Sequence, residues 1–158
     1  MKIGLISDTH DYVDPKLYDI FSDVSYILHA GDITSENVII ELETIKPVIA
    51  VHGNSDYWPI INRYPAQRIV EFEGFNIYLT HIIGYKKDLL FRLRREKIQT
   101  TPHIAVFGHY HAPSVEKVHD ILFINPGCAG QQRAKGRRSV AIFELNYNQE
   151  ATYKFVEL

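Results

Sequence analysis

Short apolar runs and amphipathic segments alternate over the first third of the chain. Three runs rich in isoleucine, leucine and valine have the length and composition of strands buried in a parallel sheet, namely Lys2–Ser7, Tyr26–Ala30 and Val48–His52. Between them, Pro15–Ser22 and Thr34–Ile45 place apolar residues on one face of a helix. This order of strands and helices predicts right-handed crossovers and a largely parallel sheet.

Polar residues mark the expected helix ends. Asp14 precedes the first helix and is expected to cap it, and both Thr34 and Ser35 are suitable caps for the second. A short polar side chain at this position accepts a hydrogen bond from a free amide of the first turn. Pro47 stops the second helix, because proline cannot continue its hydrogen-bond ladder.

The remainder of the chain is dominated by short β-like segments. They are Arg68–Phe72, Phe75–Thr80, His103–Phe107, Ser114–Val118, Ile121–Ile124, Ser139–Leu145 and Thr152–Val156. Glu73-Gly74 and His119-Asp120 predict hairpin turns. Lys86–Lys97 is the remaining helix candidate. Two stacked sheets enclosed by helices would accommodate so many strands, and we predict a single domain over residues 1–158.

Composition restricts the function classes. The chain of 158 residues is 46% hydrophobic and 23% charged, which is typical of a globular protein. A formal net charge of −2 gives no global field that would attract nucleic acid or a membrane. A single cysteine, Cys128, excludes an internal disulfide and an all-thiolate metal site. Without a signal-peptide core or a run of about 20 apolar residues, a cytoplasmic protein is expected.

Side chains with metal-binding chemistry follow five of the predicted strands. They occur in Asp8-Thr9-His10, Gly31-Asp32, Gly53-Asn54, His81 and Gly108-His109-Tyr110-His111. Because the carboxyl ends of neighbouring parallel strands meet at one edge of a sheet, ligands bind there in open α/β folds. The repeated placement therefore indicates one functional site.

Seven residues form the candidate set: Asp8, His10, Asp32, Asn54, His81, His109 and His111. Oxygen and nitrogen ligands without thiolate suit divalent manganese, iron, nickel or zinc. Seven ligands exceed what one tetrahedral ion uses, but they can hold two ions when one carboxylate is shared. Two ions about 3.5–4 Å apart form a clamp for in-line displacement at phosphorus and acidify a bridging water.

These ordered motifs resemble those of the calcineurin-like metallophosphoesterases, and their spacing is similar to that of the small single-domain prokaryotic phosphodiesterases of that superfamily. Asn125-Pro126-Gly127 matches a further turn of this subgroup. The resemblance runs from Lys2 to about Gly127. It implies an α/β fold, a four-layer αββα sandwich of two mixed β-sheets flanked by helices.

The resemblance also implies a role for each ligand. One metal ion is expected on Asp8, His10 and His111, the other on Asn54, His81 and His109, with Asp32 shared between them. A bridging hydroxide would attack phosphorus, and Asp32, Asn54 and His109 form the catalytic set. We expect two divalent metal ions per chain, manganese foremost with nickel, iron or zinc as alternatives. A small phosphodiester is the expected substrate, and a homodimer or tetramer the expected assembly.

Two positions depart from the family pattern. Many members have a histidine directly after the Gly-Asn pair, where it assists the leaving group, whereas this chain has Ser55. A serine hydroxyl cannot donate a proton near neutral pH, because its pKa is too high. The fourth motif often reads His-Gly-His, whereas here His81 is followed by Ile82. The ligand is retained, but the shape of the substrate pocket is expected to differ.

Other polar residues have more ordinary explanations. His29 and His52 lie in or beside apolar runs and are expected to pack in the core or behind the ligands. Asp56 either orients a ligand or makes a turn. Cys128 has no predicted basic partner and is expected to be structural.

Two alternative functions come from other classes. The small subunit of the eukaryotic retromer coat has the implied fold and acts through protein contacts, so a binding scaffold is one alternative. A scaffold, however, needs none of the seven ligand-type residues. A nuclease is the other alternative, using the basic run Arg133–Arg138 against a nucleic-acid backbone. The basic segment Lys86–Lys97 is expected to be a solvated helix face.

Overall fold

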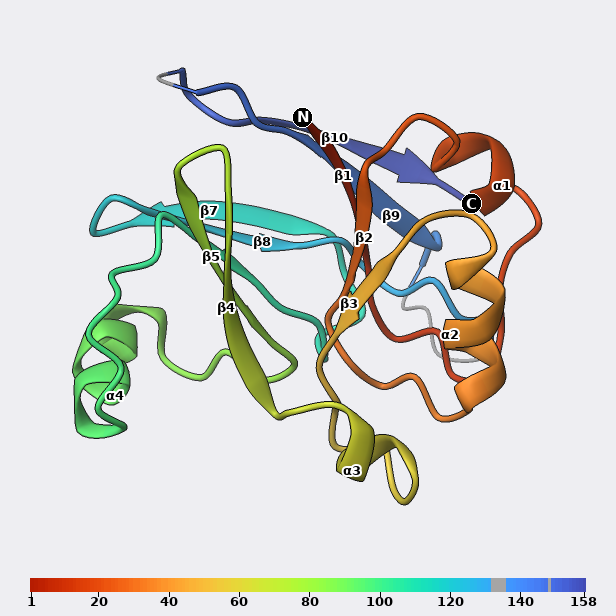
Figure 1. Ribbon diagram of the computed structural model, residues 1–158, viewed down its shortest axis with the longest axis horizontal. Coiled ribbons are helices and arrows are strands. Elements are labelled where there is room, and N and C mark those ends of the chain that lie inside the picture. Colours follow the sequence, from red (N-terminus) through yellow and green to blue (C-terminus); the bar gives the residue numbers. More distant parts are fainter. Residues whose placement is uncertain (132–135, 148) are drawn as a thin grey trace.

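The computed structural model describes residues 1–131, 136–147 and 149–158, and two five-stranded sheets form its centre (Figure 1). The first sheet has the order β10-β9-β1-β2-β3. Its strands are β1 (Lys2–Ile6), β2 (Tyr26–His29), β3 (Val48–Ala50), β9 (Ser139–Glu144) and β10 (Thr152–Glu157). The first three are parallel to one another, whereas β9 pairs antiparallel with both β1 and β10.

The second sheet is also mixed, with the order β4-β5-β6-β8-β7. Its strands are β4 (Gln67–Phe72), β5 (Phe75–Thr80), β6 (Ile104–Val106), β7 (Ser114–Val118) and β8 (Ile121–Asn125). Strands β5, β6 and β8 are parallel, and two antiparallel hairpins, β4–β5 and β7–β8, supply the edges. Both hairpins occur where the sequence predicts them.

Helices cover the outer faces of the two sheets. They are α1 (Leu17–Ile20), α2 (Glu36–Glu43), α3 (Ile60–Arg63) and α4 (Leu89–Arg95), with a 3₁₀ turn, η1 (Lys86–Asp88), before α4. In Figure 1, α1 and α2 lie beside the first sheet, α4 lies beyond the second, and α3 projects at one edge. The observed layers confirm the predicted αββα sandwich.

Three apolar clusters hold the layers together. Neighbouring residues of β1 point to opposite faces, because side chains alternate along a strand. Ile6 packs with Phe21 and the helices, whereas Leu5 packs with Leu28 and the second sheet. Leu93 belongs to a third cluster, between α4 and the second sheet. Burial on both faces explains why the central strands read as continuous apolar runs.

The helices are shorter than the sequence predicts. Only Leu17–Ile20 is helical within Pro15–Ser22, because the residues on either side form turns; the Asp14 carboxylate accepts from the Lys16 amide at 2.9 Å in the first of these turns. Ser35 is the cap of α2, accepting from the Asn37 amide. The helix in the Lys86–Lys97 segment starts only at Leu89, after η1.

Gly4 in β1 leaves room for a core aromatic ring, and this provides a test of the packing. A Cβ at Gly4 would lie 2.8 Å from two ring atoms of Phe21, which is fully buried. We expect Gly4→Ala to lower the free energy of unfolding by about 1–3 kcal/mol in urea titrations. In a Phe21→Leu background the added cost of Gly4→Ala should shrink. An equal cost in both backgrounds would contradict this packing.

Candidate metal centre

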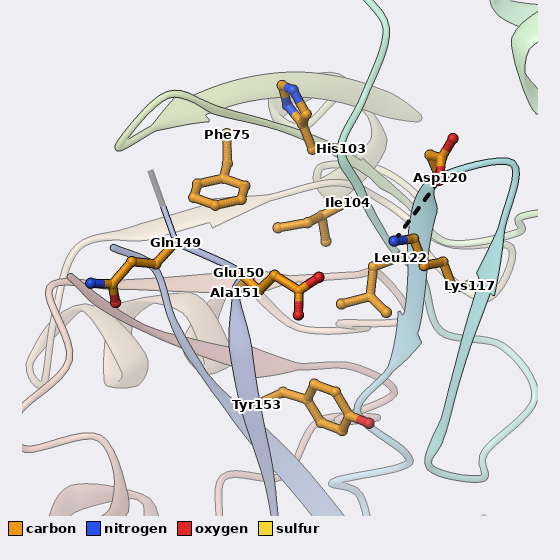
Figure 2. Close-up of a pocket in the computed structure, with 10 residues that line it drawn as sticks. All are labelled: Phe75, His103, Ile104, Lys117, Asp120, Leu122, Gln149, Glu150, Ala151 and Tyr153. Carbon is orange, nitrogen blue, oxygen red and sulfur yellow. Dashed lines mark ion pairs between the residues drawn. The ribbon is translucent and has the colours of Figure 1, made fainter. Parts of the chain in front are cut away.

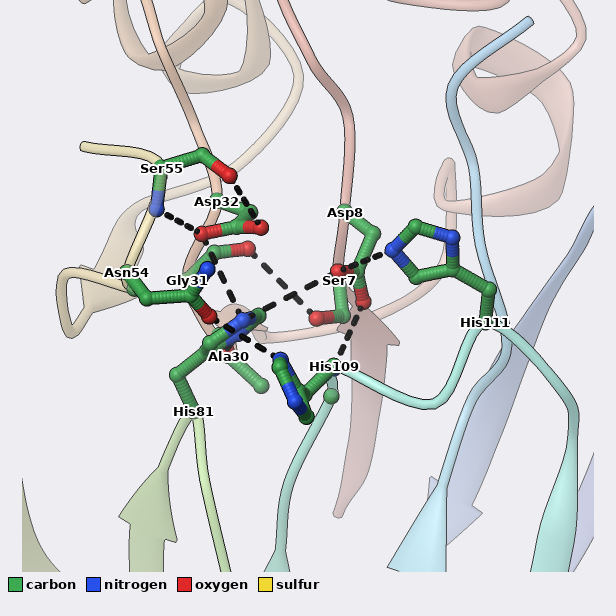
Figure 3. Close-up of polar contacts among 12 residues, drawn as sticks. Ser7, Asp8, Ala30, Gly31, Asp32, Asn54, Ser55, His81, His109 and His111 are labelled. Atoms are coloured by element: carbon green, nitrogen blue, oxygen red, sulfur yellow. Dashed lines mark hydrogen bonds and ion pairs between the residues drawn. The ribbon is translucent and has the colours of Figure 1, made fainter. Parts of the chain in front are cut away.

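All seven predicted ligands lie at the edge where β1, β2, β3, β5 and β6 end. Figure 3 labels all of them except His10. The backbone turns sharply there. Several ligand residues have left-handed backbone conformations, with φ of 54° at Asp8, 55° at Asp32 and 71° at His109. Such conformations cost non-glycine residues about 1–2 kcal/mol each, so the surrounding fold must hold them in place.

Four of the ligands form one compact group. Asp8, His10, Asp32 and His111 each offer an oxygen or nitrogen atom, and these atoms all lie within 4.8 Å of one another. His111 Nε2 lies 3.1 Å from Asp8 Oδ1, and His10 Nε2 lies 3.8 Å from Asp32 Oδ2. The family resemblance implies that Asp8, His10 and His111 lie together, and the structure brings them together.

The other three ligands meet on the opposite side of Asp32. His109 Nδ1 lies 2.9 Å from Asn54 Oδ1, and the rings of His109 and His81 are 5.3 Å apart between centroids. His81 Nε2 lies 3.3 Å from Asp32 Oδ1. Asp32 therefore contacts both groups, through Oδ2 on one side and Oδ1 on the other.

Two buried atoms show that this set fits a bound cation. Asp8 Oδ1 and His81 Nε2 form no hydrogen bond within the described residues, although both are buried. Leaving such atoms unpaired is costly, and a divalent cation would satisfy both. His81 Nδ1 donates to the Ala30 carbonyl at 2.8 Å, which leaves Nε2 as the ligand nitrogen.

Comparison with known proteins agrees with this chemistry. The model of the calcineurin-like phosphoesterase superfamily domain matches residues 1–148. The chain belongs to this superfamily. It is 37% identical over 132 residues to a probable metallophosphoesterase of Methanothermobacter thermautotrophicus, covering 80% of this chain and 76% of the relative. It is 33% identical over 150 residues to a phosphodiesterase of Methanocaldococcus jannaschii, covering 82% of this chain and 86% of the relative.

Solved structures share the whole fold. An archaeal phosphodiesterase superposes with a TM-score of 0.78 at 27% identity, covering 100% of both chains. Vacuolar protein sorting 29 from Cryptosporidium parvum superposes with a TM-score of 0.76 at 20% identity, covering 99% of this chain and 97% of the other. At that level of identity the second likeness shows the fold alone.

The two carboxylates of this calcineurin-like site have pKa values that are shifted in opposite directions. Burial raises the pKa of Asp8, and the nearby His81 and His111 oppose that rise only in part. Burial would also raise the pKa of Asp32, but the nearby His81 and the hydrogen bonds from the Ser55 amide and hydroxyl prevail and lower it well below the ordinary value. Asp32 is thus held as the anion, which a shared metal ligand requires.

Ser55 has a role that the sequence did not reveal. Its amide donates to Asp32 Oδ1 at 2.8 Å, and its hydroxyl donates to Asp32 Oδ2 at 2.9 Å. Both bonds fix the carboxylate that faces the two ligand groups. Serine is common in turns, so nothing in its spacing distinguished it from a loop residue.

Asp56 orients two ligand-bearing turns, which resolves the choice left open by the sequence. Its carboxylate accepts from the Gly53 amide at 2.7 Å and from the Thr34 amide at 2.6 Å. It therefore ties the turn that carries Asn54 to the turn that follows Asp32. Gly53 must itself be glycine, because an added Cβ would overlap Asp32 Oδ1.

His29 lies behind the site, fully buried, as expected for a packed histidine. The Gly31 amide donates to His29 Nδ1 at 3.2 Å, so Nε2 carries the proton and donates to Thr9 Oγ1 at 3.0 Å. Thr9 precedes His10, and Gly31 precedes Asp32. One neutral imidazole thus joins the two turns that present these ligands.

Asn125 and Cys128 lie near the site and have structural roles. Asn125 donates from Nδ2 to the Gly108 carbonyl at 2.8 Å and thereby supports the turn that carries His109. The thiol of Cys128 is buried and donates to the Asp8 carbonyl at 3.3 Å, consistent with a structural role. His52 is only half-buried; its Nδ1 donates to the Gly53 carbonyl at 3.3 Å, and it lines the pocket beside Asn54 and His81.

The basic run Arg133–Arg138 is described only in part, since Arg133 and Lys135 lie outside the described residues. Arg137 pairs with Glu157 at 2.8 Å. Arg138 pairs with Asp14 at 2.7 Å, and its guanidinium lies over the ring of Tyr12. These two arginines therefore have partners within the chain.

Of two pockets in the structure, one adjoins the candidate ligands and the other does not. A pocket of about 300 Å³ adjoins the site, lined by Asn54, His81 and their neighbours His52, Gly53, Ala66, Thr80 and Ile82. A larger one, of about 490 Å³, lies where β5, β6 and β8 begin, at the opposite edge (Figure 2). Phe75, Ile104 and Leu122 line the larger pocket, which contains none of the seven ligands. Only the smaller of these two pockets therefore adjoins the candidate metal centre.

Among the described residues, no helix is long and apolar enough to span a membrane.

Neutral His29 predicts a specific pH dependence of stability. Burial, together with the nearby His81 and His10, lowers its pKa from 6.5 to about 3 against the opposing effect of Asp32. Between these pH values the unfolded chain binds a proton that the folded protein does not, so stability falls as pH falls. In metal-free protein, wild type should lose up to about 1.4 kcal/mol per pH unit more than His29→Gln between pH 6 and 4.

Urea titrations at each pH measure this difference, because the remaining titrating groups are common to both proteins. Parallel pH profiles for wild type and His29→Gln would show that His29 is not held neutral.

Proposed function

We propose that this protein is a phosphodiesterase with a dinuclear metal centre. The observation that carries the proposal is the position of Asp32, whose Oδ2 lies 3.8 Å from His10 Nε2 and whose Oδ1 lies 3.3 Å from His81 Nε2. A carboxylate in that position can be shared by two ions. The phosphodiesterase names of an archaeal relative and an archaeal structural neighbour support the choice of reaction.

The ligand contacts support the division that the family resemblance implies. In this proposal Asp8, His10 and His111 hold one ion, Asn54, His81 and His109 hold the other, and Asp32 is common to both. Manganese is the first metal to test, because these ligands accept several divalent ions and availability decides among them. The ions supply charge neutralisation at the phosphate and a water acidic enough to attack phosphorus at neutral pH.

Burial of the ligands determines the direction from which a substrate approaches. Asp8, Asp32 and His81 are buried and form the floor of the site. Asn54 and His109 are exposed, so the phosphodiester meets the site on their side. Two divalent ions held by two aspartates leave a charge of +2, which favours an anionic substrate. The small phosphodiester contacts Asn54 and His109 while Ser55 keeps Asp32 in place.

Turnover and its metal dependence test this proposal. Metal-stripped protein refilled with Mn²⁺ should hydrolyse bis(4-nitrophenyl) phosphate, and Asp32→Asn and Asn54→Ala should each reduce kcat/KM at least about 100-fold. Asp120→Asn and Asn62→Ala change exposed residues of the same types and should retain full activity.

Turnover that survives Asp32→Asn would contradict the proposal. Two bound ions per chain without turnover of any phosphodiester would instead favour the scaffold.

The leaving group provides a second test. Ser55 Oγ is engaged with Asp32 and cannot serve as an acid for the departing oxygen. We therefore expect much faster hydrolysis of aryl phosphodiesters than of alkyl phosphodiesters, whose alkoxide leaving groups need a proton. Measured kcat values across a series of esters should fall steeply as the leaving-group pKa rises, and equal rates for the two classes would contradict this role of Ser55.

A further inference from the structure

Ile82 is a large apolar residue beside the metal centre, and the mechanism above gives it no role. It directly follows the ligand His81 and is 47% exposed. Together with Asn54 and His81 it lines the pocket of about 300 Å³, which we call the Ile82 recess. A single exposed isoleucine is ordinary on a protein surface. This one, however, stands in the wall of a pocket beside two candidate ligands, where a bound substrate would reach it.

The loop after His81 holds Ile82 in this position. The next residue, Ile83, is buried in the third apolar cluster, which also contains Leu93 of α4. Ile82, by contrast, is exposed and lines the recess. The guanidinium of Arg92, also on α4, donates from Nη2 to the Ile83 carbonyl and so fixes the backbone beside Ile82. Helix α4 therefore supports this wall of the recess from behind.

Hydrogen bonds join the other walls of the recess to one another. The His52 amide, just after β3, donates to the Pro65 carbonyl at 3.0 Å. Thr80 ends β5, and its hydroxyl donates to the Ala66 carbonyl at 3.4 Å, just before β4. Because β3 belongs to the first sheet and β4 and β5 belong to the second, the recess lies where the two sheets meet.

Gly53 connects the recess to the metal centre. It lines the recess, and a Cβ added there would overlap Asp32 Oδ1 and lie 2.8 Å from His81 Cγ. The Gly53 backbone therefore packs directly against two of the candidate ligands. Figure 3 shows Asn54 and His81 together, on the side of the site away from His111. A phosphodiester held there places one of its ester substituents beside the recess.

The lining of the recess favours an uncharged group. Among the described residues it includes no lysine, arginine, aspartate or glutamate. Ala66 and Ile82 supply apolar side chains, and the Thr80 hydroxyl is already bonded to the Ala66 carbonyl. A carboxylate, an ammonium group or a second phosphate placed there would lose its hydration without gaining a partner. A hydrocarbon group would instead be stabilised by leaving water.

We propose that the Ile82 recess binds a small uncharged hydrocarbon substituent, alkyl or aryl, on one ester oxygen of the phosphodiester that the metal centre hydrolyses. This inference rests on the proposed function and names the class of its substrate. Ile82 is then a specificity-determining residue, and the substrates are phosphodiesters of small apolar alcohols or phenols. A polynucleotide does not fit this class, because its substituents carry sugars and further phosphates.

Three inhibitors that differ in one substituent test the recess. They are the butyl, methyl and 2-carboxyethyl monoesters of methylphosphonic acid, which all carry a negative charge at phosphorus and lack a good leaving group. Competition with bis(4-nitrophenyl) phosphate in Mn²⁺-loaded protein measures the Ki of each. The butyl ester should bind about ten-fold or more tightly than the methyl ester, because three further methylene groups leave water. The 2-carboxyethyl ester should bind no more tightly than the methyl ester.

Variants at two exposed isoleucines separate the recess from the rest of the surface. Ile82→Ala should remove most of the advantage of the butyl ester over the methyl ester, because it shortens the apolar wall. Ile82→Leu keeps an apolar side chain of the same size and should retain that advantage. Ile40→Ala changes an exposed isoleucine of α2, outside the recess, and should leave the Ki of all three esters unchanged.

Methyl NMR provides a readout that needs no turnover. Protein labelled with ¹³C at the isoleucine δ1 methyl groups is loaded with diamagnetic Zn²⁺ and titrated with the butyl ester. We expect the Ile82 signal to shift and the Ile40 signal to stay in place. The two signals are assigned by their loss in Ile82→Leu and Ile40→Ala.

Three results would overturn the inference. One is an equal Ki for the butyl and methyl esters, and another is an equal effect of Ile82→Ala and Ile40→Ala. The third is tightest binding of the 2-carboxyethyl ester, which would assign the recess to a charged group. Turnover of bis(4-nitrophenyl) phosphate without a shift of the Ile82 signal removes the recess proposal alone. A shift of that signal without turnover of any phosphodiester supports the recess as a binding site and removes the phosphodiesterase proposal.

Discussion

Asp8 and Asp32 are buried side by side at the edge where two sheets end, and the arrangement of the site follows from this constraint. Two carboxylates taken out of water repel each other and lose their hydration, so they need partners of positive charge or hydrogen-bond donors. Asp32 accepts hydrogen bonds from the Ser55 amide and hydroxyl, whereas Asp8 Oδ1 has no hydrogen bond within the described residues. A divalent cation held by both carboxylates would supply that positive charge.

The surrounding fold serves to hold these groups in strained positions. The parallel strands deliver their carboxyl ends to one edge, and the chain then turns through left-handed backbone at Asp8, Asp32 and His109. Buried polar side chains tie the turns together. His29 joins the turns before His10 and Asp32, and Asp56 joins the turns around Asn54 and Thr34. Together they keep the ligands ordered.

Much of this site could be predicted because strand ends are visible in the sequence. Asp, His or Gly-Asn follows several apolar runs. If those runs form parallel strands, these residues must lie at one edge of the sheets, and the structure brings all seven ligands together there. The layered fold followed from the family resemblance and from the change to β-rich sequence after Phe72. The division of the seven ligands between two ions came from the family resemblance, and it stays a prediction.

Local details could not be predicted for physical reasons. Helix α3 has four residues, which is too few to show helical periodicity, so the projection that carries Trp58 was not expected. The role of Ser55 depends on a partner 23 residues earlier in the chain, which no local pattern contains. Helix α1 is a single helical turn with other turns on either side of it, and residue propensities do not predict where so short a helix begins and ends.

The central claim is that two metal ions share Asp32. Electron paramagnetic resonance of the Mn²⁺-loaded protein, combined with metal analysis, tests it most directly. The account predicts two Mn²⁺ per chain with an exchange-coupled spectrum, which Asp32→Asn converts to that of uncoupled ions. A single Mn²⁺ per chain with the spectrum of an isolated ion would contradict it.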